Sequence, residues 1–229
     1  MKKLVSLGLL LLTCAANGAN PHWNRYEEQT IKQLVHIPGW CSEEKAKKMM
    51  DLIYETHPKI CVEIGVFGGS SIYPTASALK YLGAGVVHAI DPWAKDDCLE
   101  GYTPDDPNYQ WWGKLDLDQV YNNFKLMLNY YSISPFCQVM RMTSKAALSH
   151  FENESIDILH IDGNHTEQVA LADAEMYLPK VKMGGYIWFD DVNWVTTNKA
   201  VAYLMRSCTI DFSRSTATCY LFKKHSNVQ

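Results

Sequence analysis

The sequence lacks several features that mark whole classes of protein. No basic run interrupts the mixed charges of this 229-residue chain, whose formal net charge is −4, so nothing in it indicates a nucleic-acid surface. Its seven cysteines include no C-x-x-C pair and no His/Cys spacing typical of a zinc site. Internal repeats and low-complexity linkers are absent as well. With 47% apolar residues, the chain can bury one sizeable core, and we expect one main domain.

The N-terminus carries an apolar run, Leu4 to Leu12, that is too short to span a bilayer as a helix. Two lysines precede this run and small residues follow it, which is the three-part pattern of a secretory signal. Residues 1–19 are therefore interpreted as a leader, and the mature chain is expected to have no stable membrane span. Export by this signal is the predicted localisation, and a cytoplasmic protein with a disordered leader is the alternative.

Strand-like and helical segments alternate along the rest of the chain. Two helical stretches occupy residues 20–58, and the main domain is predicted to cover 59–229. Alternation of this kind predicts an α/β fold: a Rossmann-like, doubly wound sheet of about seven strands with helices on both faces. Most strands should be parallel, and the last two should form an antiparallel hairpin. The five strand-like runs that each precede a helical pattern are KICVEIGV, GVVHAIDPW, FCQVMRMTS, SIDILHID and GGYIWFDDV.

One segment, at about residues 94–116, does not fit the alternation. It is rich in Asp, Pro, Gly and aromatic residues, and a loop of this length is usually functional or disordered. Its tryptophans argue against disorder. Two interpretations remain open: a lid with Trp111 and Trp112 as walls of a pocket, or a loop that those rings anchor to the core.

Polar residues follow each strand-like run at the point where the strand should end. Ligands of open parallel sheets bind at the carboxyl ends of the strands, so these residues are the candidate site. Two adjacent carboxylates at the end of a buried strand are costly unless a cation or water balances them. In chain order the residues are Glu63, Gly65, Gly68, Gly69, Ser70 and Ser71, then Asp91, then Thr143 and Ser144, then Asp162 to His165, then Asp190 and Asp191.

These motifs resemble those of a known family over residues 59–224. The chain looks like a class I S-adenosylmethionine-dependent methyltransferase, similar to the metal-dependent O-methyltransferases of the catechol and macrocin-type sugar groups. VEIGVFGGSS matches their first motif, HAIDPW matches the acidic end of the second strand, and HIDGNH with GGYIWFDDV matches their metal motif. The leader and the aromatic insertion depart from the family pattern.

The resemblance implies a position for the cofactor S-adenosylmethionine. The first-motif residues should line its methionine part, with Ser71 near the carboxylate, while Asp91 should bind the ribose. Thr143 should lie near the adenine. The first-motif residues are Glu63, Gly65, Gly68, Gly69 and Ser71.

The resemblance also implies a metal site. Asp162, Asp190 and Asp191 would together hold one Mg²⁺ or another divalent cation, a hard ion that prefers oxygen ligands. His165 stands where the catechol enzymes carry a lysine base, so Asp162 and His165 are the predicted catalytic residues. A helix-terminal histidine without chemistry, and a solvated turn for the two aspartates, are the structural alternatives.

The expected function is methyl transfer to a hydroxyl of a small diol, either a sugar or a catechol-like molecule. A nicotinamide oxidoreductase is a poor alternative, because the turn after the first strand does not fit G-x-G-x-x-G. A non-catalytic cofactor-binding protein and a hydrolytic or hydroxylase-like metalloenzyme also remain open. The expected partner is a small-molecule substrate, and a homo-oligomer is compatible with the sequence.

Overall fold

The computed structural model describes residues 20–227, so the predicted leader of residues 1–19 lies outside the described part. Within that part, helices and strands alternate as expected, joined by short 3₁₀ turns. The strands are β1 (Ile60–Ile64), β2 (Val86–Asp91), β3 (Cys137–Arg141), β4 (Ile156–Ile161), β5 (Val181–Phe189), β6 (Cys208–Ile210) and β7 (Tyr220–Lys224). The helices are α1 (Pro21–Gln33), α2 (Glu43–Thr56), α3 (Ile72–Leu82), α4 (Lys95–Cys98), α5 (Pro107–Trp112), α6 (Leu117–Tyr130), α7 (Ser144–Ala147), α8 (Glu167–Tyr177) and α9 (Asn198–Leu204).

The strands form one sheet in the order β3-β2-β1-β4-β5-β7-β6. β1 to β5 pair in parallel, and β7 pairs antiparallel with both β5 and β6. The predicted fold class, a Rossmann-like sheet with a C-terminal antiparallel hairpin, is confirmed. Because the chain order reverses between β1 and β4, this fold opens a crevice at the carboxyl ends of those strands.

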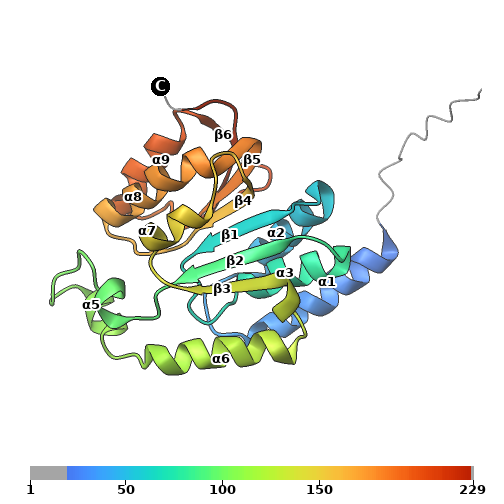
Figure 1. Cartoon of the computed structure of the whole chain (residues 1–229), viewed down its shortest axis with the longest axis horizontal. Coiled ribbons are helices and arrows are strands. Elements are labelled where there is room, and N and C mark those ends of the chain that lie inside the picture. Colours follow the sequence, from blue (N-terminus) through green and yellow to red (C-terminus); the bar gives the residue numbers. More distant parts are fainter. Residues whose placement is uncertain (1–19, 228–229) are drawn as a thin grey trace, which may run out of the picture.

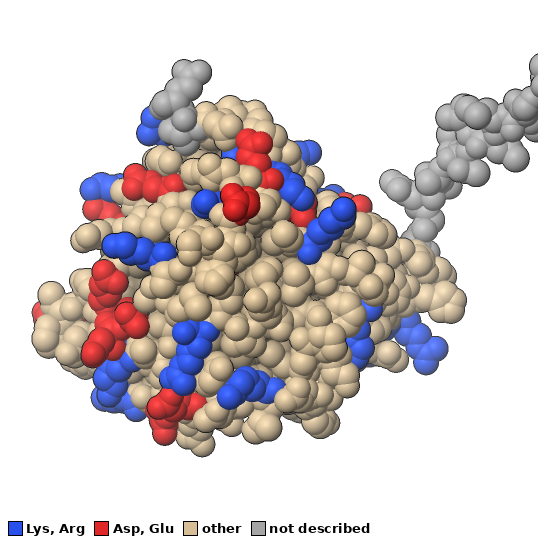
Figure 2. Space-filling model, viewed as in Figure 1, with Lys and Arg blue, Asp and Glu red and all other residues tan. Residues whose placement is uncertain are grey.

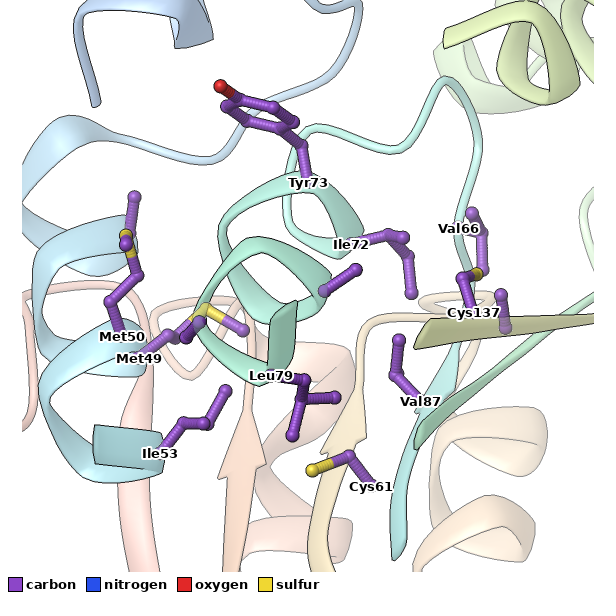
Figure 3. Packing of buried hydrophobic residues seen from close by; sticks show 14 of the residues in the cluster. Met49, Met50, Ile53, Cys61, Val66, Ile72, Tyr73, Leu79, Val87 and Cys137 are labelled. Atoms are coloured by element: carbon purple, nitrogen blue, oxygen red, sulfur yellow. The ribbon is translucent and has the colours of Figure 1, made fainter. Parts of the chain in front are cut away.

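Helices cover both faces of the sheet (Figure 1). One hydrophobic cluster joins α1, α2, α3 and α6 to one face, and a second joins α7, α8 and α9 to the other. In the first cluster, Met49 and Ile53 of α2 lie beside Leu79 of α3, above Cys61 of β1 (Figure 3). Full burial of each such side chain contributes about 1.5–3 kcal/mol, so this layer fixes α2 firmly over the sheet.

Helix α2 begins where the sequence predicts. Ser42 is its N-cap and accepts a hydrogen bond from the backbone N–H of Lys45 at 3.1 Å, while Glu43 and Glu44 occupy the first turn, where the helix dipole favours acids. Lys45 and Met49 lie four residues apart and are both buried against the sheet. A lysine therefore lies within the apolar face of α2.

The two-residue period of the strands decides which side chains face α2. Cys61 of β1, Ile158 of β4 and Trp188 of β5 belong to the cluster under α1–α3, so the residues two further along each strand face the same way. Those residues are Glu63, His160 and Asp190. Glu63 and His160 are direct neighbours in the register of β1 and β4.

The surface carries no extended patch of one charge in the view of Figure 2, where Lys and Arg alternate with Asp and Glu. This agrees with the mixed charges of the sequence. Between residues 20 and 227, no helix is both long enough and apolar enough to cross a bilayer.

Candidate active site

A cavity of about 610 Å³ lies at the carboxyl ends of β1 to β5. Its volume falls within the roughly 300–1,000 Å³ that is common for small-molecule sites. The sequence-predicted residues that line it are Gly65, Ser70, Ser71, Asp91, Thr143, Ser144, Asp162, Gly163, Asn164, His165, Asp190 and Asp191. The fold therefore brings most of the candidate residues to one cavity, while the side chain of Glu63 and the turn residues Gly68 and Gly69 lie outside its lining.

The glycine turn after β1 is shaped by close backbone contacts. Gly65 has φ +84°, and a Cβ atom there would lie 2.0 Å from the carbonyl oxygen of Asp162, so no larger residue fits between the ends of β1 and β4. A Cβ atom on Gly68 would meet the Pro38 carbonyl oxygen at 2.5 Å, and one on Gly69 would meet the Phe124 ring at 2.6 Å. Gly65 thus forms the cavity wall, and the other two glycines allow close packing behind it.

Glu63 is buried behind this turn and contacts Ser71 and His160. Its side chain is 1% exposed. One carboxylate oxygen accepts a hydrogen bond from Ser71 Oγ at 2.6 Å, and the other lies 3.0 Å from Nδ1 of His160. Glu63 therefore positions Ser71, which does line the cavity.

Asp91 is held rigidly at the end of β2. Its Oδ2 accepts hydrogen bonds from the backbone N–H groups of Val66 and Phe67 at 3.0 and 2.9 Å, and its Oδ1 accepts one from Trp93 at 2.7 Å. Burial raises the pKa of the Asp91 carboxyl, and the three N–H donors offset part of that rise. A fixed acceptor at this wall fits the ribose hydroxyls of the expected cofactor.

The end of β3 combines a helix cap with a buried acid. Thr143 Oγ1 caps α7 by accepting a hydrogen bond from the Ala146 N–H at 3.2 Å. Ser144 Oγ donates to Asp173 Oδ1 at 2.5 Å. Burial raises the pKa of the Asp173 carboxyl to about 6, because the Ser144 hydroxyl compensates only in part. Thr143, Ser144 and Asp173 all line the cavity.

The two adjacent aspartates after β5 have different surroundings. Asp190 faces α2, where its Oδ2 forms a buried ion pair with Lys45 Nζ and lies 2.6 Å from Nε2 of His160. Burial favours a raised pKa for Asp190, but Lys45 and His160 outweigh it and hold the pKa below its usual range. Burial and Lys45 lower the pKa of His160, while Glu63 and Asp190 raise it to about 9. Asp190 is thus neutralised by the protein itself.

Asp191 also lines the cavity, but its contacts differ from those of Asp190. Its backbone has φ +53°, and its carbonyl oxygen accepts hydrogen bonds from Trp194 N at 2.9 Å and Thr197 Oγ1 at 2.8 Å. A non-glycine residue in this region of φ is uncommon and often marks a functional site. The turn directs the Asp191 carboxylate toward His165, whose Nε2 lies 2.6 Å from Asp191 Oδ2.

Asp162, His165 and Asp191 form one cluster at the cavity wall. Their ligand atoms all lie within 4.8 Å of one another, and Nε2 of His165 is 3.8 Å from Asp162 Oδ1. Burial lowers the pKa of His165, but the two carboxylates outweigh it and raise it to about 10. Burial and Asp190 raise the pKa of Asp162, against the effect of Lys45. The two carboxylates therefore favour a protonated His165 near neutral pH.

The donor set fits a divalent cation. Two carboxylates and one imidazole are ligands that Mg²⁺, Mn²⁺ and related ions accept, with the imidazole favouring the transition metals. Within residues 20–227, Nε2 of His165 finds no hydrogen-bond acceptor of suitable geometry, although it contacts Asp191. Asp190 belongs to a separate cluster with His160 and Cys219. The three aspartates predicted as one ligand set are thus divided between two clusters.

Two residues of the site escaped the sequence analysis. Lys45 is 4% exposed and lines the cavity, and His160 is 2% exposed beneath it. Both carried a sequence signal: Lys45 shares a helix face with Met49, and His160 interrupts an apolar strand. A polar residue inside an apolar pattern needs a partner, and here each finds Asp190.

The aromatic insertion contributes to the cavity and is anchored at the same time. Trp111 and Trp112 line the cavity, and their rings pack against each other at 4.7 Å and against Trp40 at 5.2 and 6.5 Å. On the other side, the Tyr102 hydroxyl accepts a hydrogen bond from the N–H of His165 at 3.1 Å. The segment predicted as one long loop contains the short helices α4 and α5, and Trp112 both lines the cavity and packs against the hydrophobic core. Its role as a lid stays a prediction.

Comparisons with known proteins point to methyltransferases. A family profile described as a methyltransferase domain matches residues 62–192, more than half of the chain. Among curated proteins, y4gI of Sinorhizobium fredii, described as uncharacterized, is 26% identical over 146 residues. That alignment covers 62% of this chain and 14% of the relative, so the chain spans a small part of that protein's length.

Two solved structures share the fold over nearly their whole length. The O-methyltransferase NovP matches with a TM-score of 0.66 at 14% identity, covering 90% of this chain and 98% of NovP. The SAH-bound methyltransferase PaMTH1 of Podospora anserina matches with a TM-score of 0.59 at 14% identity, covering 93% of this chain and 91% of that one.

Proposed function

Because the chain belongs to the methyltransferase domain family, as a class I S-adenosylmethionine-dependent methyltransferase, we propose that it methylates a hydroxyl oxygen of a small diol with the help of a divalent cation. The expected diol is a sugar or a catechol-like molecule. Both present two adjacent hydroxyls that replace water on such a cation.

One observation carries this proposal. The cluster of Asp162, His165 and Asp191 faces the same cavity as Gly65 and Asp91. A cofactor held by the strand-end residues and an acceptor held at the cluster would therefore share one cavity. Proximity of this kind is the main requirement for a direct group transfer.

In the proposed reaction, the chain's residues bind, orient and accept a proton. Asp91 accepts hydrogen bonds from the ribose, and the turn at Gly65 and Ser71 accommodates the methionine part. S-adenosylmethionine, when bound, supplies an electrophilic methyl group, and a divalent cation lowers the pKa of a hydroxyl. Asp162 and Asp191 hold the cation. Asp162 and Asp191, when they hold a divalent cation, would no longer stabilise the proton on His165, whose pKa would then fall toward that of an ordinary imidazole. In its neutral form, His165 would accept the hydroxyl proton as the methyl group passes from the sulfonium to the hydroxyl oxygen and the sulfur keeps the bonding electron pair as a thioether.

Tryptophans set the character of the acceptor side. Trp40, Trp111, Trp112 and Trp194 line the cavity, and Trp194 lies 4.9 Å from the His165 ring, centroid to centroid. Flat aromatic walls suit planar rings and the apolar faces of sugars, and they exclude water from the reacting atoms.

The test is a transfer assay with methyl-labelled S-adenosylmethionine. The acceptors are a catechol, a sugar with vicinal hydroxyls and their mono-hydroxyl analogues, each with Mg²⁺, with Mn²⁺ and with a chelator. We expect label in a diol, dependent on the ion, and little label in the matched mono-hydroxyl compound. Label transferred equally well in the chelator would remove the role of the cation and leave a metal-independent methyltransferase.

The leader suggests where this reaction takes place. We propose export directed by residues 1–19, on the basis of their charged, apolar and small-residue pattern. Fusion of these residues to a reporter enzyme and assay of the secreted fraction test this, and a reporter retained in the cytoplasm would support the alternative location.

A further inference from the structure

We propose that Lys45 is a positioning residue that keeps Asp190 out of the ligand set, so that a divalent cation in this cavity is bound by Asp162 and Asp191 on the side away from α2. This inference rests on the proposed function only for the existence of the ion site. It assigns to the ammonium group of Lys45 the role of a permanent counter-cation for one of the three strand-end aspartates.

The first support is the contact itself. Lys45 Nζ forms its buried ion pair with Oδ2 of Asp190, and the side chains of the two residues are 6% and 9% exposed. Nε2 of His160 approaches the same oxygen at 2.6 Å. Two donors on one oxygen, with little water nearby, leave Asp190 poorly placed to bind a further cation.

The second support is that His160, the other partner of Asp190 Oδ2, is itself held in place. His160 is held on its other nitrogen by Glu63, whose second oxygen accepts the hydrogen bond from Ser71. The contacts thus form one chain in the order Ser71, Glu63, His160, Asp190 and Lys45. Both aspartates line the cavity, but Asp190 contacts Lys45 of α2, whereas Asp191, with φ +53°, contacts His165.

The third support is the position of the ammonium group relative to Asp162. Lys45 Nζ lies 3.6 Å from Asp162 Oδ2, and His165 approaches the other oxygen, Oδ1. A positive charge at this distance opposes a second cation next to it. Lys45 therefore limits both the number of carboxylates that reach an ion and the affinity of the site.

The decisive measurement is Mn²⁺ binding by calorimetry to the full chain and its variants. Lys45→Met keeps the length of the side chain but removes its charge, so the carboxylate of Asp190, which already lines the cavity, becomes available to the ion. We expect Mn²⁺ affinity to rise by at least about tenfold, which corresponds to ~1.4 kcal/mol. Lys45→Arg retains the charge and is expected to bind Mn²⁺ as the wild type does.

The double variant Lys45→Met with Asp190→Asn separates the specific effect from a general loss of positive charge. If Asp190 is the ligand gained, most of the increase in Mn²⁺ affinity disappears when Asp190 is also replaced, and only the part due to the lost Lys45 charge remains. An increase of the same size in the double variant would overturn the proposal, because the loss of the Lys45 charge would then account for all of it. Unchanged or weaker binding in Lys45→Met would overturn it as well.

S-adenosylmethionine affinity, measured on each variant, reports whether the fold is intact. Should Lys45→Met not fold, Lys45→Leu, which is also uncharged and offers Asp190 no hydrogen-bond donor, takes its place with the same expectations. If the wild type shows no measurable Mn²⁺ binding, the result for Lys45→Met decides. Mn²⁺ binding by Lys45→Met supports the proposal, and no Mn²⁺ binding by either protein overturns it. The transfer assay on the wild type tests the proposed function separately, so the two failures are distinguishable.

Discussion

Asp190 and Asp191 are neighbours in the chain, yet they belong to two regions with opposite electrostatics. On the α2 side, Lys45 and His160 neutralise Asp190 in a closed, buried network. Asp191, within residues 20–227, forms an ion pair with His165 alone, and His165 also approaches Asp162. The comparison teaches that the protein supplies positive charge for the carboxylate that is buried away from water. It leaves the negative charge of Asp162 and Asp191 only partly compensated, at the place where a ligand is expected to bind.

The largest expected effect is on turnover, from the cavity side. His165→Ala removes the proposed proton acceptor and should lower the rate of methyl transfer by about 100- to 10,000-fold. The free energy of unfolding should change little, because the cluster is partly exposed. Transfer rates and urea unfolding of the variant measure both, with His150→Ala, an exposed histidine outside the cavity, as the matched control. A His165→Ala enzyme with a near wild-type rate would show that the histidine is not the base.

The next effect is on stability, from the α2 side. His160→Leu leaves Glu63 and Asp190 buried without the imidazolium between them, and should lower the free energy of unfolding by about 3–5 kcal/mol. Urea unfolding at pH 7 measures the loss. A change below about 1 kcal/mol would mean that water or rearrangement satisfies both carboxylates, and that the network is not closed.

A third carboxylate sharpens the comparison, because it is buried like Asp190 but has no cation. The pKa of Asp173 in the folded state is about 6, above its unfolded value, so ionisation destabilises the fold as pH rises from about 4 to about 6. Asp173→Asn keeps an acceptor for Ser144 and cannot ionise. It should therefore be more stable than the wild type by up to ~3 kcal/mol above pH 6, with no advantage near pH 4.

Unfolding free energies of wild type and Asp173→Asn across pH 4–8 test this prediction. Ser144→Ala serves as a control, since it removes the hydroxyl that Asp173 accepts and leaves the carboxyl able to ionise. A difference between wild type and Asp173→Asn that does not vary with pH would show that Asp173 does not titrate in this window.

The smallest effect is expected where an ion pair lies in water. Lys199 and Glu167 form a surface pair at 2.6 Å, with side chains 64% and 46% exposed. Lys199→Ala should change the free energy of unfolding by less than about 1 kcal/mol, because solvent screens the pair. The same urea measurement as for His160→Leu checks it, and an effect as large as that of the buried network would remove the contrast between the two regions.

Much of the fold could be predicted because its signals are local. The alternation of apolar strands with helical patterns gave the seven-stranded sheet and its C-terminal hairpin, and the strand ends indicated Gly65, Asp91 and Asp162 as cavity residues. The carboxyl ends of parallel strands meet at one edge, so residues at these positions gather whatever their distance in the chain. The pairing of Asp162 with His165, three residues apart, also follows from short-range geometry.

The division of the aspartates was decided by the tertiary structure. Lys45 and Asp190 are 145 positions apart, and only the packing of α2 on β1, β4 and β5 brings them together. A strand's two-residue period indicates that neighbouring side chains face opposite sides, but it does not say which helix covers each side or what charge that helix carries. That choice depends on long-range contacts between Met49, Ile53 and the sheet, because burial of apolar area holds a helix in place whatever polar residue its face also contains.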